Sequence, residues 1–283
     1  MSEARDTPVF YWVPGCANCT RLKAYLTDRG VSYRSVNIQA DPAALEALTA
    51  AGHRALPVFR MGERWIAGDE RDIDAALGLA PRAPARSPTA RELVERGARM
   101  LDLAGDLAMQ LPPEHFDDPT PTLADFVAAG RYLADGQPYI PHGTSKSLVH
   151  HIAQHGEKAR RLLLASDGIH ELGFAIDGSG EYSFFGEPEP GTPMYRVAAG
   201  MRLAASDLRA WLASGRSEQD LNRMLETHRG PRTMLQYLKI QAIGLLQHTR
   251  QLTAIVDALE IAPSGRVADA DLADLNMPSG VWE

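Results

Sequence analysis

The stretch "VPGCANCTRL", Val13 to Leu22, contains both cysteines of this 283-residue chain. It follows "PVFYWV", an apolar run of the length of a buried strand. From Cys19 onward, "CTRLKAYLTDRG" carries apolar side chains at helical spacing and ends in a glycine. The sequence therefore predicts a strand, a turn that carries Cys16 and Cys19, and a helix.

The alternation of strands and helices continues to about residue 79. "VSYRSVNI" predicts a second strand, and "DPAALEALTAAG" a helix with Asp41 at its cap. "LPVFRM" and "RWIA" predict a hairpin around Gly62, and "DERDIDAALG" predicts a closing helix. The predicted order is βαβαββα, typical of an α/β sheet to which the last hairpin adds an antiparallel edge.

The predicted position of Cys16 favours a reactive thiol. Free N–H groups and the positive dipole end at a helix start lower a thiol pKa below its free value of about 8.5. Cys19 follows one helical turn later, so its sulfur can meet that of Cys16. We expect Cys16 to be the nucleophile and Cys19 the resolving thiol. The alternatives are half of a metal site, since structural zinc needs four ligands, or two inert thiols.

Two longer stretches, "FYWVPGCANCTRL" and "ALPVFRMGERWIAGDERDIDAAL", resemble the glutaredoxin and mycoredoxin families over residues 7–79. The resemblance implies a thioredoxin-type fold with a cis peptide bond at Pro57, and thiol–disulfide oxidoreductase activity. It also implies a site for glutathione or a related low-molecular-weight thiol. The residues that match this site are Leu56, Pro57, Gly68 and Asp69.

The character of the sequence changes after Leu79. "APRAPARSPTA" lacks periodicity and suits a linker. Four long amphipathic segments follow, at about 90–111, 146–166, 195–214 and 232–260, and they predict a four-helix bundle. The segments 112–145 and 167–193 are expected to be loops, the first with room for one short helix. We therefore divide the chain into domains 1–79 and 91–283, joined by a linker over 80–90.

Three histidines of the second half have the spacing of metal ligands. His151 and His155 are four residues apart and share one face of the second long helix. His248 lies on the fourth, and the interior of a bundle is a common place for a metal. The alternative is a pair of histidines on a solvated helix face.

The stretches "LVHHI", "QHTRQLTAIVDALEI" and "DLADLNMPSGVWE" resemble the DinB-like bundle superfamily over about residues 90–283. This superfamily includes metal- and thiol-dependent S-transferases and thiol-dependent isomerases. The resemblance implies a divalent metal, Zn²⁺ or Ni²⁺, held by one histidine of the second helix and an H-x₃-H pair of the fourth. His151 and His248 match, but Gly244 occupies the earlier position of the pair. Either His155 substitutes for that ligand or the metal is lost. Bundles of this kind often dimerise, which allows a homodimer.

Further polar and aromatic residues of the second half are open to two interpretations. Arg250 and Gln251 either contact an anionic ligand or cap and solvate their helix. The aromatic residues of this part line a pocket or belong to the core: Trp211, Tyr182, Phe184 and Phe185.

Composition narrows the class of protein. A net charge of −7 argues against general nucleic-acid binding, which needs a basic face. No apolar run approaches the roughly 20 residues that span a bilayer, and "MSEARDTPVF" does not resemble a signal peptide. We expect a cytoplasmic protein without a membrane partner. In that reducing compartment a CxxC pair is more often catalytic or metal-binding than structural.

Three functions follow from these observations. The first is a thiol–disulfide oxidoreductase whose fused bundle binds a small-molecule or disulfide substrate. The second places the chemistry in the bundle, as a metal- and thiol-dependent S-transferase or isomerase. The third is a non-catalytic redox sensor that binds a ligand.

Overall fold

The computed structural model describes residues 7–13, 16–38, 40–53, 56–67, 70–80, 86–120, 144–164, 192–215, 221–225, 232–275, 277 and 280–282. The N-terminal unit, from β1 to α3, has the predicted order. Its elements are β1 (Val9–Trp12), α1 (Ala17–Asp28), β2 (Arg34–Asn37), α2 (Pro42–Ala50), β3 (Val58–Met61), β4 (Arg64–Ile66) and α3 (Glu70–Leu77). The sheet order is β2-β1-β3-β4. Strand β1 runs parallel to β2 and antiparallel to β3, and the β3–β4 hairpin forms the predicted antiparallel edge.

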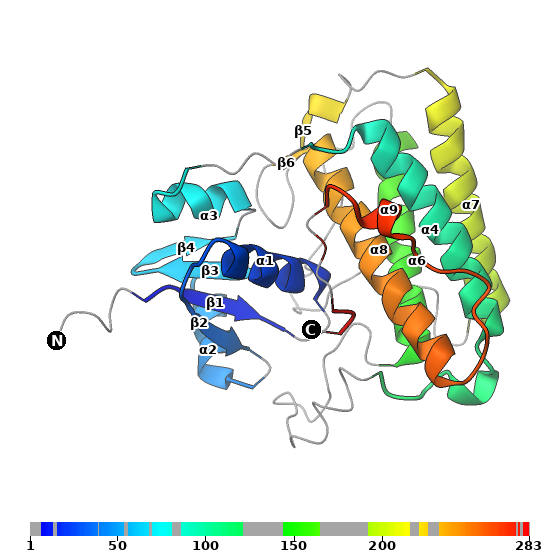
Figure 1. Ribbon diagram of the computed structural model, residues 1–283, viewed down its shortest axis with the longest axis horizontal. Helices are drawn as coiled ribbons and strands as arrows, with labels where there is room; N and C mark the ends of the chain where they lie inside the picture. The colour runs from blue at the N-terminus through cyan, green and yellow to red at the C-terminus, as the bar shows by residue number, and fades with distance from the viewer. Residues whose placement is uncertain are drawn as a thin grey trace.

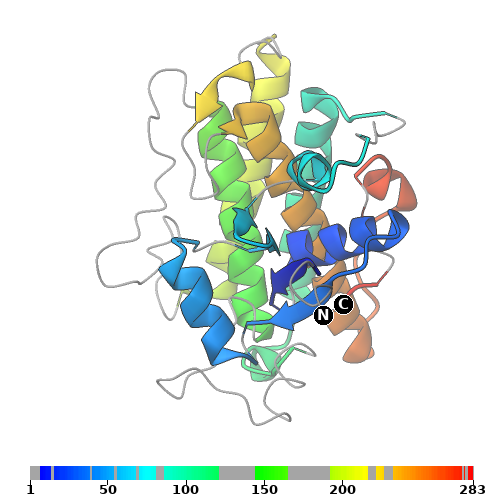
Figure 2. The same ribbon diagram turned by 90° about the vertical axis from the view of Figure 1, so that its left-hand side faces the viewer.

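The two faces of this sheet have separate apolar cores, because successive side chains of a strand point to opposite faces. Phe10 of β1 packs with residues of α1 and with Ile73 of α3. Its neighbours Val9 and Tyr11 pack on the other face, where α2 contributes Leu48. Figures 1 and 2 show α1 and α3 on one side of the sheet and α2 on the other. Helix α1 therefore packs directly against the sheet, immediately after strand β1.

Polar contacts also hold α1 against α3. The hydroxyl of Tyr25 donates to Oδ2 of the buried Asp74 at 2.6 Å, and the guanidinium of Arg29 lies 3.5 Å from the other oxygen. Arg21 pairs with Glu70 at the start of α3. These contacts link two helices on one face of the sheet.

Four long helices form the bundle: α4 (Ala90–Gln110), α6 (Ser145–Leu164), α7 (Met194–Ala213) and α8 (Met234–Ala258). All four were predicted to within two residues at either end. Helices α4 and α6 each pack against both α7 and α8, so the four surround one apolar core (Figure 1). Capping boxes explain where two of them begin: Thr89 with Glu92 starts α4, and Thr233 with Gln236 starts α8.

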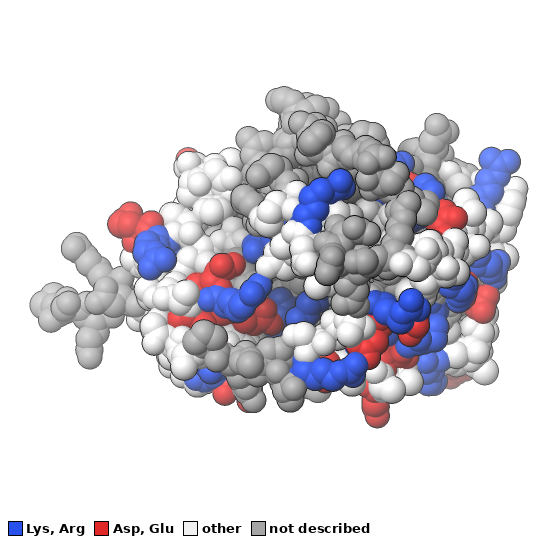
Figure 3. Space-filling view, turned by 90° about the horizontal axis from the view of Figure 1, so that it is seen from above, with Lys and Arg blue, Asp and Glu red and all other residues white. Residues whose placement is uncertain are grey.

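Shorter elements accompany the bundle: η2 (Pro113–His115), β5 (Met224–Leu225), β6 (Arg232–Thr233) and α9 (Asp269–Leu272). Trp211 is buried in the bundle core, as the core interpretation of the aromatic residues expects. Tyr182, Phe184 and Phe185, and most of the two predicted loops, lie outside the described residues. On the face shown in Figure 3, basic and acidic side chains are interspersed rather than separated by sign.

The N-terminal unit contacts the bundle through α1, which packs against α8. A second contact comes from Arg232 of β6, two residues before the start of α8. Its guanidinium donates to the carbonyl of Ala67 at 3.1 Å and lies 3.6 Å from Oδ2 of Asp72. Among the described residues, no helix is long and apolar enough to cross a membrane.

Candidate functional site

The two cysteines lie at the start of α1, where the sequence predicted them. Cys16 is the N-cap residue of the helix and forms a disulfide with Cys19. Its Sγ accepts a hydrogen bond from the backbone N–H of Cys19 at 3.2 Å. The first turn of α1 contains no acidic residue that would oppose a thiolate there. Cys19 is only 1% exposed, whereas Cys16 is half-buried, so the outer sulfur of the pair belongs to Cys16.

The peptide bond between Leu56 and Pro57 is cis, as the resemblance implied. Leu56 and Cys16 both pack against the apolar cluster that contains Cys19. The start of β3 therefore borders the redox pair. Gly68 and Asp69, the other residues of the predicted thiol site, lie outside the described residues.

The structure brings His151, His155 and His248 together, and we call these three residues the histidine cluster. His151 and His155 come from α6, and His248 comes from α8. Their candidate ligand atoms all lie within 4.8 Å of one another. The ring of His151 lies 4.8 Å from that of His155 and 4.7 Å from that of His248, between centroids. Three imidazoles thus converge from two facing helices.

Gly244 explains how His155 reaches this position. A Cβ atom added to Gly244 would lie 2.6 Å from Nε2 of His155 and 2.8 Å from its Nδ1. The imidazole of His155 therefore occupies the space that a side chain at position 244 would need. The resemblance placed a ligand at position 244 of the fourth helix, and the structure fills that place with an imidazole from α6.

Two glutamines fix the ring orientations within the cluster. Nδ1 of His155 lies 2.7 Å from Oε1 of Gln241, and Nδ1 of His248 lies 2.7 Å from Oε1 of Gln251. Burial lowers the pKa of His248 to about 4, against a weaker opposing effect of its hydrogen bond to Gln251. This imidazole is thus neutral at neutral pH, and the neutral form is the one that binds metals.

The donor set fits a divalent metal that prefers imidazole, such as Zn²⁺ or Ni²⁺. Three protein ligands with one open position are the pattern of catalytic zinc sites, whereas structural zinc sites use four. The amides of Gln241 and Gln251 would then be the outer partners that orient two of the ligands.

The contacts of Gln241 and Gln251 with the histidine cluster were not predicted from the sequence. Gln251 is 1% exposed, so it does not solvate its helix, and its amide contacts His248. Arg250 donates to Oε1 of Gln247 at 2.9 Å. The signal available in the sequence was the i, i+3 spacing of His248 and Gln251 on one helix.

Comparison with known proteins identifies the N-terminal unit. The family model described as Glutaredoxin matches residues 9–66. Curated relatives include the Glutaredoxin-like protein NrdH of Escherichia coli K12, of Escherichia coli O157:H7 and of Shigella flexneri. Each is 35% identical over 68 residues, which are 24% of this chain and 84% of the relative. The chain belongs to the glutaredoxin family.

As a glutaredoxin, the chain is a thiol–disulfide oxidoreductase, and Cys16 and Cys19 form its CxxC motif. The mixed four-stranded sheet with its flanking helices is a thioredoxin-like fold. The family match ends at residue 66, before the linker and the four long helices. No solved structure matches the chain.

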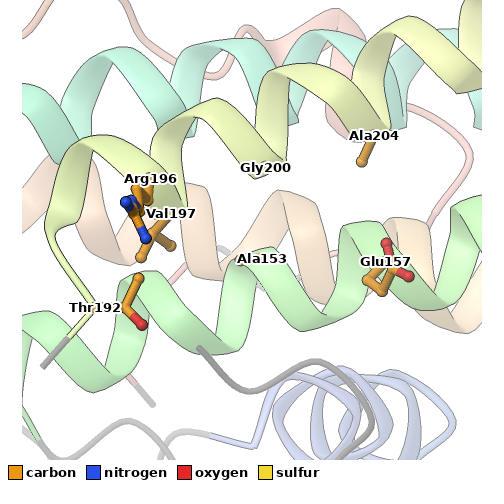
Figure 4. A pocket seen from close by; sticks show the side chains of 7 residues that line it. All are labelled: Ala153, Glu157, Thr192, Arg196, Val197, Gly200 and Ala204. Atoms are coloured by element: carbon orange, nitrogen blue, oxygen red, sulfur yellow. The ribbon is translucent and has the colours of Figure 1, made fainter. Parts of the chain in front are cut away.

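A pocket of about 170 Å³ lies between α6 and α7 (Figure 4). It is lined by Ala153, Glu157, Thr192, Arg196, Val197, Gly200 and Ala204. Burial raises the pKa of Glu157, but hydrogen bonds from Arg160 and Arg161 outweigh it and hold the pKa below its ordinary value. The carboxylate is thus already paired with two cations. No cysteine or cluster histidine lines this pocket, so we do not assign the chemistry to it.

Proposed function

We propose that Cys16 is the attacking thiol of this oxidoreductase and that Cys19 resolves the intermediate. The Cys16 thiolate attacks a substrate disulfide, forms a mixed disulfide and expels one thiolate. Cys19 then attacks the Cys16 sulfur and releases the second thiolate, which leaves the Cys16–Cys19 disulfide. Two molecules of a low-molecular-weight thiol reduce that disulfide and are themselves joined as a disulfide.

The observation that carries this proposal is the unequal placement of the two sulfurs at a helix start. Cys16 caps α1 and is the more exposed, so it can meet a substrate and gains from the helix dipole. Cys19 is buried beneath it, within reach of Cys16 but not of a bulky disulfide.

We assign the thiol site to Leu56, Pro57, Gly68 and Asp69, with glutathione or a related thiol as its occupant. The support is the position of Leu56, which packs on the same cluster as Cys16. The family membership supports thiol-based chemistry without selecting the thiol.

The test uses the full chain, glutathione and a small mixed-disulfide substrate. Cys16→Ser should abolish turnover, and Cys19→Ser should only slow it, because glutathione can replace the resolving thiol. Full activity of Cys16→Ser would refute the assigned roles. If the wild-type chain is reduced by a disulfide reductase but not by glutathione, the thiol site is refuted, whereas the roles of the two cysteines still stand.

A second proposal concerns the histidine cluster, which we assign to a divalent metal, Zn²⁺ or Ni²⁺. The convergence of three imidazoles around the backbone of Gly244 supports it. A metal with an open position supplies Lewis-acid chemistry, which at a bound thiol favours the thiolate. This assignment favours a thiol-dependent S-transferase or isomerase activity of the bundle over a metal-free sensor.

Elemental analysis of the full chain after dialysis against Zn²⁺ or Ni²⁺ tests this proposal. We expect about one metal per chain, as for a site of three protein ligands. His151→Ala and His248→Ala should each lose it. His150→Ala is the matched control, since His150 is the neighbour of His151 on α6 but lies outside the cluster. A wild-type chain without metal, or equal loss in the control, would refute the site.

The remaining predictions concern the whole protein. We propose a DinB-like bundle over 91–283, joined by the linker 80–90 to a glutaredoxin domain over 1–79. The bundle would bind a small-molecule or disulfide substrate close to the redox pair and so raise its effective concentration there. A cytoplasmic location and a homodimer also stay predictions, and the solution mass of the full chain tests the latter.

A further inference from the structure

The C-terminal segment of residues 280–282 packs against α8 beside the histidine cluster. Nε2 of Gln247 donates to the carbonyl of Val281 at 2.7 Å, and Nε2 of Gln251 donates to the same carbonyl at 3.1 Å. Trp282 packs against the bundle core. The segment is therefore anchored by polar contacts and by an apolar side chain.

The carbonyl of Val281 determines which way the amide of Gln251 faces. A carbonyl oxygen only accepts hydrogen bonds, so the NH₂ group of Gln251 must point toward it. The Oε1 atom of Gln251 then faces Nδ1 of His248, at 2.7 Å. The two hydrogen bonds together exclude the orientation of Gln251 in which Oε1 and Nε2 exchange places.

The orientation of this amide in turn determines the tautomer of His248. Oε1 of Gln251 only accepts, so Nδ1 of His248 must carry the proton. In a neutral imidazole the other nitrogen, Nε2, then holds the lone pair. That lone pair is what a metal ion needs, and the reverse tautomer would present an N–H to it.

We propose that Gln251, locked by the carbonyl of Val281, is a positioning residue that holds His248 in its metal-binding tautomer. The inference rests on the metal site proposed above. It makes segment 280–282 the outermost layer of that site, although this segment supplies no ligand. It also distinguishes Gln251 from Gln247, which binds the same carbonyl but bonds to Arg250 instead of a histidine.

The experiment compares the full wild-type chain with Gln251→Leu, Gln251→Glu and Gln247→Leu. Long-range ¹H–¹⁵N correlation in the metal-free chain reports the tautomer of His248, and competition with a chromophoric chelator gives the affinity for Zn²⁺. Gln251→Leu should lose the pure Nδ1–H form and bind Zn²⁺ about 10–100-fold more weakly. Gln251→Glu keeps an acceptor for Nδ1–H and should retain both properties. Gln247→Leu should weaken both properties less than Gln251→Leu does, because Gln247 holds the carbonyl of Val281 but bonds to Arg250 instead of His248.

Each contrary result has a distinct meaning. Wild-type tautomer and affinity in Gln251→Leu would overturn the positioning role. Equal weakening in Gln247→Leu would also overturn it, since docking of the segment alone would then explain the effect. A wild-type chain with the Nδ1–H form that binds no Zn²⁺ would overturn the proposed metal site while upholding the tautomer lock.

Discussion

A Cβ atom on Gly244 would lie 2.6 Å from Nε2 of His155, closer than packed atoms approach one another. The imidazole of His155 on α6 can therefore lie where it does only because position 244 of α8 has no side chain. The glycine at a position where the sequence resemblance expects a ligand leaves, in the folded bundle, the space that the imidazole of His155 occupies.

Gly244→Ala should displace His155 and weaken Zn²⁺ binding at least about tenfold, the size of effect seen when ligand orientation is disturbed. The matched control is Gly156→Ala on α6, whose added methyl would meet the side chain of Leu101 on α4. Both variants overpack the bundle, at a cost of about 1–3 kcal/mol. Only Gly244→Ala should lose metal in chelator competition, and similar loss in the control would contradict the prediction.

A ligand exchange tests the same relationship in the other direction. His155→Ala removes the imidazole and vacates the space beside position 244. Adding Gly244→His should return an imidazole to that space and restore metal binding, because the two substitutions share one volume and are not independent. If the double variant binds Zn²⁺ no more tightly than His155→Ala alone, an imidazole at position 244 cannot replace that of His155.

The two cysteines should differ in reactivity after the disulfide is reduced. Cys16 lies at the helix start, so the rate of its reaction with iodoacetamide should reach half its maximum at a pH below 8.5, which is about the pKa of a free thiol. Cys19 should react more slowly because it is 1% exposed. Mass spectrometry of peptides after timed alkylation measures both rates. Faster modification of Cys19 would reverse the roles that we assign.

The metal-free chain should lose stability in acid because His248 is buried in its neutral form. Its pKa is about 4 in the folded chain against 6.5 ordinarily, so the unfolded chain takes up a proton first as the pH falls. The free energy of unfolding should therefore fall by about 3 kcal/mol between pH 6.5 and 4, then level off. Urea denaturation in chelator measures it. His248→Leu is the control and should lack this component, whereas an unchanged slope would refute the assignment.

Arg232 should stabilise the contact between the N-terminal unit and the bundle. Its side chain is only 12% exposed, and it binds the carbonyl of Ala67 and the carboxylate of Asp72. Arg232→Ala should lower the free energy of opening this contact by about 1–3 kcal/mol, as for hydrogen bonds to charged groups. Hydrogen exchange of backbone amides in α1 and α8 measures it. The exposed Arg64 of β4 is the control site, and Arg64→Ala should leave exchange unchanged.

By itself the sequence determined the elements and the redox pair. Strand and helix periodicity, the cap at Asp41 and the position of Cys16 depend on neighbours within one or two turns of chain, so they can be read locally. The order βαβαββα, four long helices and the cysteines at a helix start were all predicted. The i, i+4 pair of His151 and His155 was visible for the same reason.

Only the tertiary structure decided how distant residues meet. The fit of His155 against Gly244 depends on the separation of α6 and α8, which side-chain packing along both helices sets. The hydrogen bond between Gln251 and the carbonyl of Val281 joins residues 30 positions apart. No local pattern encodes such a contact, because it forms only when the bundle has closed and the buried polar groups must find partners.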